Sequence, residues 1–132
     1  MESGSDPELE AAIDHARATL PEFVTRVADP NLAYSLVALK VRFSLPDEST
    51  RDIWLDEAAY VNGEFSGNMG DDLPTLHLAF DDRLVINQAD IIDWMIVENH
   101  KLVGGFTIRL ACLRMTPEEQ KRFLESLGYS LE

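Results

Sequence analysis

The chain has 132 residues, of which 24 are acidic and 11 are basic, so its formal charge at neutral pH is −13. A chain of this length is expected to form one domain, and its 45% of hydrophobic and 27% of charged residues are ordinary for a globular protein. The charge argues against binding to nucleic acid phosphates or anionic lipid, and it favours a basic protein or a cation as partner. Solubility alone also accounts for such a charge.

The first predicted element is a kinked helix, or two short helices, over residues 6–28. Asp6 followed by Pro7 is typical of a helix start, because the carboxylate accepts from free backbone N–H groups and proline suits the first turn. Apolar side chains then recur at helical spacing. Pro21 lacks a backbone N–H and therefore breaks or kinks this helix.

The middle of the chain predicts six to eight short strands. Residues 37–43 alternate between apolar and polar side chains, which is the pattern of a strand with one buried face. Asn62-Gly63 is a strong signal for a two-residue hairpin turn, and Asn99-His100 is a second candidate for a tight turn. The other predicted strands cover residues 52–55, 59–61, 64–67, 76–80, 84–86, 93–97 and 102–113.

The end of the chain predicts a capped helix. Thr116-Pro117-Glu118-Glu119 has the pattern of a capping box, and Gly128 is a typical helix stop. Strands that follow one another without helical crossovers form an antiparallel sheet. The predicted fold class is α+β: an N-terminal kinked helix, a strongly curved antiparallel sheet or small partly open barrel, and a C-terminal helix. Residues 6–132 are expected to form this single domain after a disordered stretch at residues 1–5.

Several ordered segments carry a resemblance to a known family. They are Asp6-Pro7-Glu8-Leu9, residues 16–23, Ala38-Leu39-Lys40-Val41, Ile53-Trp54-Leu55, Phe65-Ser66-Gly67, Ile91-Ile92-Asp93-Trp94-Met95 and residues 101–109. Together they resemble the YegJ-like family of small bacterial proteins of unknown function, over roughly residues 6–128. The resemblance implies a stand-alone bacterial domain and brings no activity, cofactor or catalytic residue. Some members of that family carry a secretory leader; the first residues here lack that pattern, so a cytoplasmic location is expected.

Catalytic and metal-binding motifs are weak in this sequence. Cys112, the single cysteine, lies in an apolar run and is expected to be a buried structural thiol. Asp71-Asp72 and Asp81-Asp82 would bind a divalent cation only if their loops converged, and solvated turns are the simpler interpretation. The histidines, which share no metal-ligand spacing, are His15, His77 and His100. We therefore expect no metal, cofactor or catalytic residue, and whether the protein is an enzyme stays open.

One constellation is a candidate site for a ligand or a partner. Its members are Trp54, Asp93, Trp94, Gly105, Thr107 and Arg109. Thr107 and Arg109 point to one face if residues 102–113 are a strand, and Asp93 would then meet Arg109 across the predicted turn at Asn99-His100. Two aromatic side chains, a charged pair and a glycine gap are what a small binding cleft needs. The alternative interpretation is a core containing both tryptophans and a structural ion pair.

Three functions follow from these features. The first is a non-catalytic acidic module that docks a basic protein, as an immunity protein docks a toxin, with Trp54 or Trp94 as anchor. The second is a small enzyme or ligand binder with its cleft at Trp54, Asp93, Trp94 and Arg109. The third is a structural module that homodimerises through an exposed sheet edge, and the protein is expected to be either a monomer or a weak homodimer.

Overall fold

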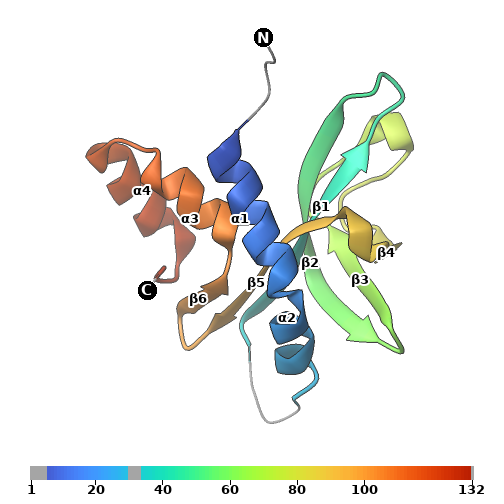
Figure 1. Ribbon diagram of the computed structural model, residues 1–132, viewed down its shortest axis with the longest axis horizontal. Coiled ribbons are helices and arrows are strands. Elements are labelled where there is room, and N and C mark those ends of the chain that lie inside the picture. The colour runs from blue at the N-terminus through green and yellow to red at the C-terminus, as the bar shows by residue number, and fades with distance from the viewer. Residues whose placement is uncertain (1–5, 30–33, 132) are drawn as a thin grey trace.

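A computed structural model describes residues 6–29 and 34–131 and has the predicted α+β class (Figure 1). The helices are α1 (Pro7–Ala18), α2 (Leu20–Val27), α3 (Phe106–Leu113), α4 (Pro117–Leu127) and the short 3-10 helices η1 (Pro74–Leu76) and η2 (Gln88–Asp90). The strands are β1 (Leu36–Ser44), β2 (Thr50–Val61), β3 (Glu64–Met69), β4 (Arg83–Ile86), β5 (Ile91–Glu98) and β6 (Lys101–Gly104). The expectation of disorder at residues 1–5 lies outside the described residues.

The six strands form one antiparallel sheet in the order β4-β3-β2-β1-β5-β6, open rather than closed into a barrel. Both predicted tight turns are present. Asn62 and Gly63 join β2 to β3, and Asn99 and His100 join β5 to β6, all four with positive φ. Positive φ at both central residues gives a turn whose twist matches that of the flanking strands.

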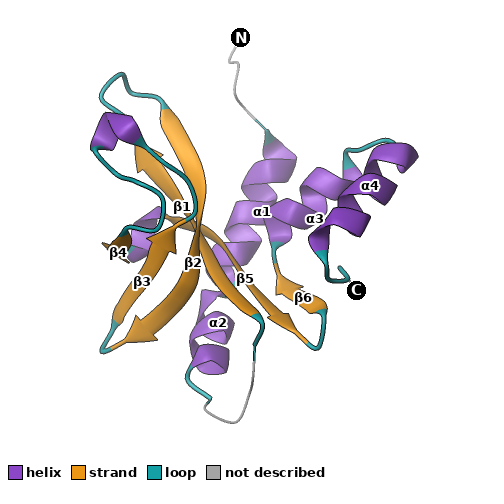
Figure 2. Ribbon diagram, turned by 180° about the vertical axis from the view of Figure 1, so that it is seen from behind, coloured by secondary structure: helices purple, strands orange, loops and turns teal. Residues whose placement is uncertain are grey.

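The N-terminal helix is two helices, as the proline predicts. The Asp6 side chain accepts from the Leu9 backbone N–H at 3.2 Å and so caps α1. α1 ends at Ala18, with Thr19 as the capping residue, and Pro21 lies in the first turn of α2. Both helices lie against one face of the sheet (Figures 1 and 2), where they bury Ile13, Ala16, Leu20 and Phe23. This layer contains the main core.

The structure corrects the predicted strand at residues 102–113. β6 ends at Gly104, and residues 106–113 form helix α3 instead. Gly104 and Gly105 have φ of +78° and +66°, a backbone conformation that ends the strand and turns the chain into the helix. Periodicity cannot tell a short apolar run in a buried helix from one in a buried strand, which is why the prediction was wrong here.

The predicted strand at residues 76–80 is also wrong. The chain there forms η1 and then turns, with φ of +59° at His77 and +73° at Asp81. In contrast, two short predicted strands merge into the single strand β2, whose pairing with β3 shifts register between Asp56 and Ala59. A β-bulge absorbs such a shift without ending the strand.

The C-terminal helix α4 begins and ends as predicted. Thr116 and Glu119 form a reciprocal capping box, and Gly128 ends the helix with φ of +76°. The chain then returns to the sheet and covers the outer edge of β6. There the Leu102 N–H donates to the Ser130 carbonyl at 2.7 Å. Across the part of the chain that the structure describes, every helix is too short or too polar to cross a membrane.

Candidate functional site

Strand register separates the two tryptophans of the predicted constellation. Leu39 on β1 pairs with Trp94 on β5, whereas the next residue, Lys40, pairs with Trp54 on β2 and Asp93 on β5. Neighbouring residues of a strand point to opposite faces of the sheet. Trp94 therefore faces α1 and α2, and Trp54 faces the other side.

Trp94 is a core residue, in line with the structural interpretation. It is 1% exposed, and its ring centroid lies 5.8 Å from that of Phe23 and 6.0 Å from that of Phe106. Its indole N–H donates to the Thr19 hydroxyl at 3.1 Å, so its one polar group is satisfied inside the fold. Trp94 is thus unavailable as an anchor for a partner.

Asp93 is a fully buried carboxylate that caps helix α3 from a neighbouring strand. One oxygen accepts from the backbone N–H groups of Trp94 at 2.8 Å and Phe106 at 3.2 Å. The other accepts from the N–H of Thr107 at 2.8 Å and from its hydroxyl at 2.6 Å. Burial raises the pKa of Asp93, and the four hydrogen bonds oppose that rise. The carboxylate satisfies two of the free N–H groups at the start of α3.

Lys40 joins this group, and sequence reasoning missed it. Its ammonium donates to the Thr107 hydroxyl at 3.2 Å and lies 5.7 Å from the ring centroid of Trp54. Trp54, Lys40 and Asp93 therefore form one row across β2, β1 and β5. The polar face of β1 was visible in the alternating sequence, but which residues it pairs with was not.

Arg109 does not pair with Asp93, contrary to prediction. Its guanidinium donates to the backbone carbonyls of Gly104 and Leu102, both at 2.8 Å, and to that of Leu131. Since residues 106–113 are helical, Arg109 points toward β6 and the C-terminal segment instead. Gly105 contributes a backbone N–H that donates to the Trp94 carbonyl at 2.7 Å.

The predicted constellation therefore holds α3 and the C-terminal segment on the sheet. Asp93, Gly105 and Thr107 do come together, and Trp54 reaches them through Lys40. Because four donors occupy the two oxygens of the carboxylate, it is not presented to a ligand. The arrangement is that of a buried helix cap.

A second group of residues lies in the loop between β3 and β4, residues 70–82, here named the aspartate loop. Leu73, 1% exposed, anchors the loop in the core and exchanges two backbone hydrogen bonds with Leu78. Asp72 accepts from the Phe80 N–H, and Asp82 accepts from the Ala79 N–H, both at 2.8 Å. These bonds hold the Asp72 and Asp82 carboxylates against the backbone of the loop.

The aspartate loop presents an aromatic side chain to solvent. Phe80 is 63% exposed, whereas Leu73 of the same loop is buried and Leu76 and Leu78 are partly buried. Asp81 and Asp82 follow it directly in sequence, and its backbone N–H donates to the Asp72 carboxylate. Aromatic side chains, phenylalanine among them, are enriched at the cores of protein interfaces.

Like charges crowd together beside this loop. Burial and the negative charges of Glu57 and Asp81 raise the pKa of the Asp56 carboxyl. Among the described residues, no lysine or arginine forms an ion pair with Asp56, Glu57 or Asp81. Nearby Arg83 instead donates to neutral acceptors, including the backbone carbonyl of Glu57 at 2.7 Å.

Comparison with known proteins identifies the family. The chain matches, over residues 6–131, the family described as "Uncharacterized protein conserved in bacteria (DUF2314)". The chain belongs to the DUF2314 family. It is also 30% identical over 99 residues to "Uncharacterized protein YegJ" of Escherichia coli (strain K12), and that match covers 74% of this chain and 62% of the relative. The resemblance found in the sequence is thus confirmed, and no solved structure matches the chain.

The described residues of this DUF2314 protein do not gather into a metal site. Within them, no group of three or more histidine, cysteine, aspartate or glutamate side chains is placed to hold an ion. The two aspartate pairs lie in one loop, but the Asp72 and Asp82 carboxylates accept hydrogen bonds from backbone N–H groups. Cys112 is buried, as predicted.

Proposed function

We propose that this DUF2314 protein is a non-catalytic binding module that docks a basic protein. The docking surface is the acidic end of the sheet, defined as the aspartate loop together with Asp56 and Glu57. The observation that carries the proposal is the exposure of Phe80 within a loop where the Asp72 and Asp82 carboxylates are held by backbone N–H groups. One concrete version is an acidic protein that neutralises a basic toxin.

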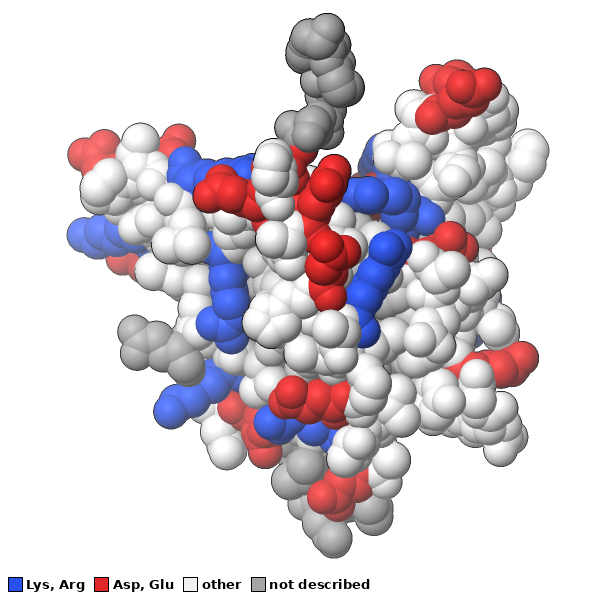
Figure 3. Space-filling view, in the orientation of Figure 1, with Lys and Arg blue, Asp and Glu red and all other residues white. Residues whose placement is uncertain are grey.

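The distribution of charge supports this end of the molecule over others. Along residues 44–98 there are 13 acidic and two basic residues, and six of the acidic ones lie at the acidic end; of these six, only Asp71 forms an ion pair within the described part of the chain, with Arg51 at 3.5 Å. At the start of α1, by contrast, the carboxylates of Asp6 and Glu8 pair with Arg114 at 2.6 and 3.0 Å. Figure 3 likewise shows acidic and basic side chains interleaved over the helical face. Unpaired carboxylates attract a cationic partner at long range, whereas paired ones contribute little.

The physical roles of the two residue types differ. Crowded carboxylates speed the encounter with a basic protein and are sensitive to salt. An aromatic side chain that becomes buried in the complex supplies affinity and slows dissociation. Phe80 takes the anchoring role that the sequence assigned to Trp54 or Trp94. The alternative of a cleft at Trp54, Asp93, Trp94 and Arg109 is not supported, because Asp93 and Arg109 are satisfied within the fold.

Affinity capture from a lysate of the source organism tests the proposal. The wild-type protein is compared at low and high salt with the double variant Asp81→Asn/Asp82→Asn. The amide oxygen that the second substitution introduces can still accept from the Ala79 N–H, so the loop keeps its shape. The matched control, Glu118→Gln/Glu125→Gln, removes the same charge from exposed positions on α4, far from the loop along the longest axis (Figure 1).

We expect the wild type and the control to retain a basic protein at low salt and to release it at high salt. The Asp81→Asn/Asp82→Asn variant should fail to retain that protein. Retention that is equal in all three proteins, or that does not depend on salt, contradicts it. Circular dichroism of each variant establishes that the loss is not a loss of folding.

A further inference from the structure

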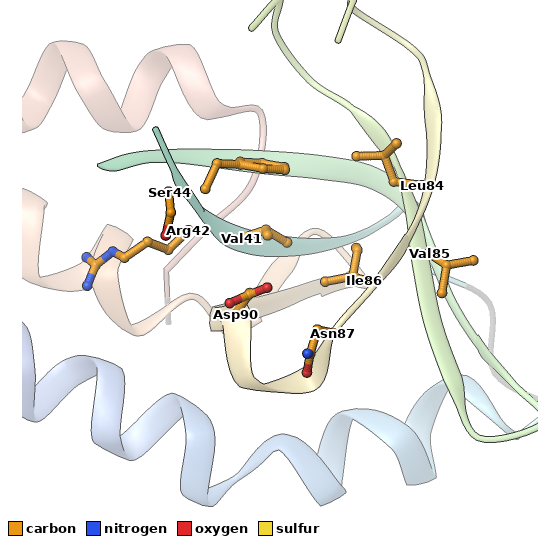
Figure 4. A pocket seen from close by; sticks show the side chains of 9 residues that line it. Val41, Arg42, Ser44, Leu84, Val85, Ile86, Asn87 and Asp90 are labelled. Carbon is orange, nitrogen blue, oxygen red and sulfur yellow. The ribbon is translucent and has the colours of Figure 1, made fainter. Parts of the chain in front are cut away.

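A narrow gap separates the edge strand β4 from the last residues of β1. β5 pairs with β1 only as far as Val41, so residues 42–44 pair with β2 alone. The sheet curls so that β4 approaches the edge of β1 that β5 leaves free, and a pocket of about 200 Å³ lies between β4 and β1 (Figure 4). Its lining consists of Val41, Arg42, Phe43, Ser44, Leu84, Val85, Ile86, Asn87 and Asp90.

The two edges of the sheet are treated differently by the fold. The C-terminal segment covers β6 through hydrogen bonds of Ser130 with Leu102 and His100. The outer edge of β4 has no strand partner among the described residues, and Val85 in its middle is 68% exposed. Native proteins usually blunt or cover such an edge, since it templates pairing with another chain.

The shape and chemistry of the gap fit an extended chain. At about 200 Å³ the gap has room for one or two side chains of a segment whose backbone lies along β4, and it is smaller than the roughly 300–1,000 Å³ usual for small-molecule pockets. Its floor is apolar, formed by Val41, Leu84 and Ile86. At its rim Asp90 carries no ion pair among the described residues, whereas Arg42 is neutralised by Asp52 at 2.8 Å. A bound strand with alternating apolar and basic side chains would place the apolar ones on this floor and a basic one beside Asp90.

We infer that the basic partner adds an extended segment as a strand between β4 and β1. This inference rests on the proposed function and deepens it, because it names the form in which the partner binds. Backbone hydrogen bonds to the edge of β4 supply affinity, and alternate side chains supply specificity. The inserted apolar side chains contact Val41, Leu84 and Ile86, and a basic side chain meets Asp90.

The probe is a synthetic peptide of about six residues with alternating lysine and valine, capped at both ends. We expect it to change the amide chemical shifts of residues 42–44 and 83–86 and to slow hydrogen exchange there. The same peptide with alternate backbone nitrogens methylated loses strand hydrogen bonds and is expected to bind at least about tenfold more weakly.

Two valine substitutions provide the matched variants. Val85→Lys places a charge in the middle of the β4 edge and is expected to abolish the peptide-induced shifts. Val61→Lys changes an equally exposed valine, 62% against 68%, that does not line the gap, and it is expected to leave them unchanged. Shifts confined to other residues, equal binding of the methylated peptide, or equal effects of the two lysine variants would overturn the inference.

A second copy of the chain is the competing occupant. A mass that doubles with concentration, together with protection of the β4 amides without peptide, would assign the edge to a homodimer and overturn the inference. Its failure can be told from failure of the proposed function. Suppose that a captured partner no longer binds the Asp81→Asn/Asp82→Asn variant but binds the Val85→Lys variant with unchanged affinity. The proposed function then stands, and only the inference that the partner adds a strand at β4 is rejected.

Discussion

Asp93 and Thr107 are joined by two hydrogen bonds across 14 positions of sequence, from the backbone N–H and from the hydroxyl of the threonine to one carboxylate oxygen. The pair fixes the start of α3 to β5, and the Lys40 ammonium on β1 donates to the Thr107 hydroxyl at 3.2 Å. A buried carboxylate is stable in a protein only when its oxygens are satisfied. The attachment of the C-terminal helices to the sheet thus depends on one acidic residue.

Replacing Asp93 by asparagine should be strongly destabilising. The amide has one acceptor oxygen in place of two, and its NH₂ group faces N–H groups that can only donate. We expect the free energy of unfolding to fall by about 3 kcal/mol, because buried donors lose their partner. Urea unfolding of the variant measures this loss. Thr107→Val should cost about 1 kcal/mol, since one hydroxyl is removed. An Asp93→Asn variant as stable as wild type would show that the cap is dispensable.

The glycine that ends β6 should tolerate no side chain. A Cβ atom at Gly104 would lie 2.5 Å from the Trp94 carbonyl oxygen, and its φ is +78°. At Gly63, φ is +81°, but nothing lies within 4 Å. Gly63→Ala should therefore cost only the backbone strain, about 1 kcal/mol, and Gly104→Ala considerably more. Thermal unfolding of both variants separates the two effects. Equal losses would mean that the contact with Trp94 is relieved by a small shift.

Acid should weaken the attachment of α1 to Arg114. The hydrogen bonds from Arg114, and then that from the Leu9 N–H, lower the pKa of Asp6 from 3.8 to about 2. Because the folded-state pKa is lower than the unfolded one, the contribution to stability is present above pH 3.8 and is lost as the pH falls through about 2. Unfolding measured between these pH values should show a smaller loss for Asp6→Asn than for wild type. Parallel curves for the two proteins would argue against this role.

The acidic end should be more stable without its charge. Asp81→Asn removes one of the negative charges beside Asp56, and asparagine accepts the φ of +73° found at this position. We expect the free energy of unfolding at neutral pH and low salt to rise by up to about 0.5 kcal/mol, with a smaller gain at high salt. Chemical unfolding at two salt concentrations checks this. A loss of stability would mean that Asp81 makes a favourable contact in the fold.

Local features of the fold were predictable from the sequence. The caps at Asp6 and Thr116, the turns at Asn62 and Asn99, and the helix break at Pro21 each depend on residues a few positions apart. Their physical causes act over a single turn of chain, so the local pattern is sufficient.

The candidate site was less predictable, because it depends on register and burial. That Trp54 and Trp94 face opposite sides follows from which residues of β1 they pair with, and no local pattern reveals this. The role of Lys40 was hidden for the same reason. Phe80 beside Asp81 was visible in the sequence, but an apolar residue next to a turn can be core or surface, and only the packing decides.

The association rate of the captured basic partner, measured from about 50 to about 300 mM salt, tests the docking of a basic protein most directly. The wild type and Glu118→Gln/Glu125→Gln should show the same steep fall in rate with salt, whereas Asp81→Asn/Asp82→Asn should associate more slowly and with a shallower dependence. Phe80→Ala should leave the association rate nearly unchanged and speed dissociation by about tenfold or more. An association rate that is independent of salt, or that the loop and the α4 variants change equally, would contradict docking at the acidic end.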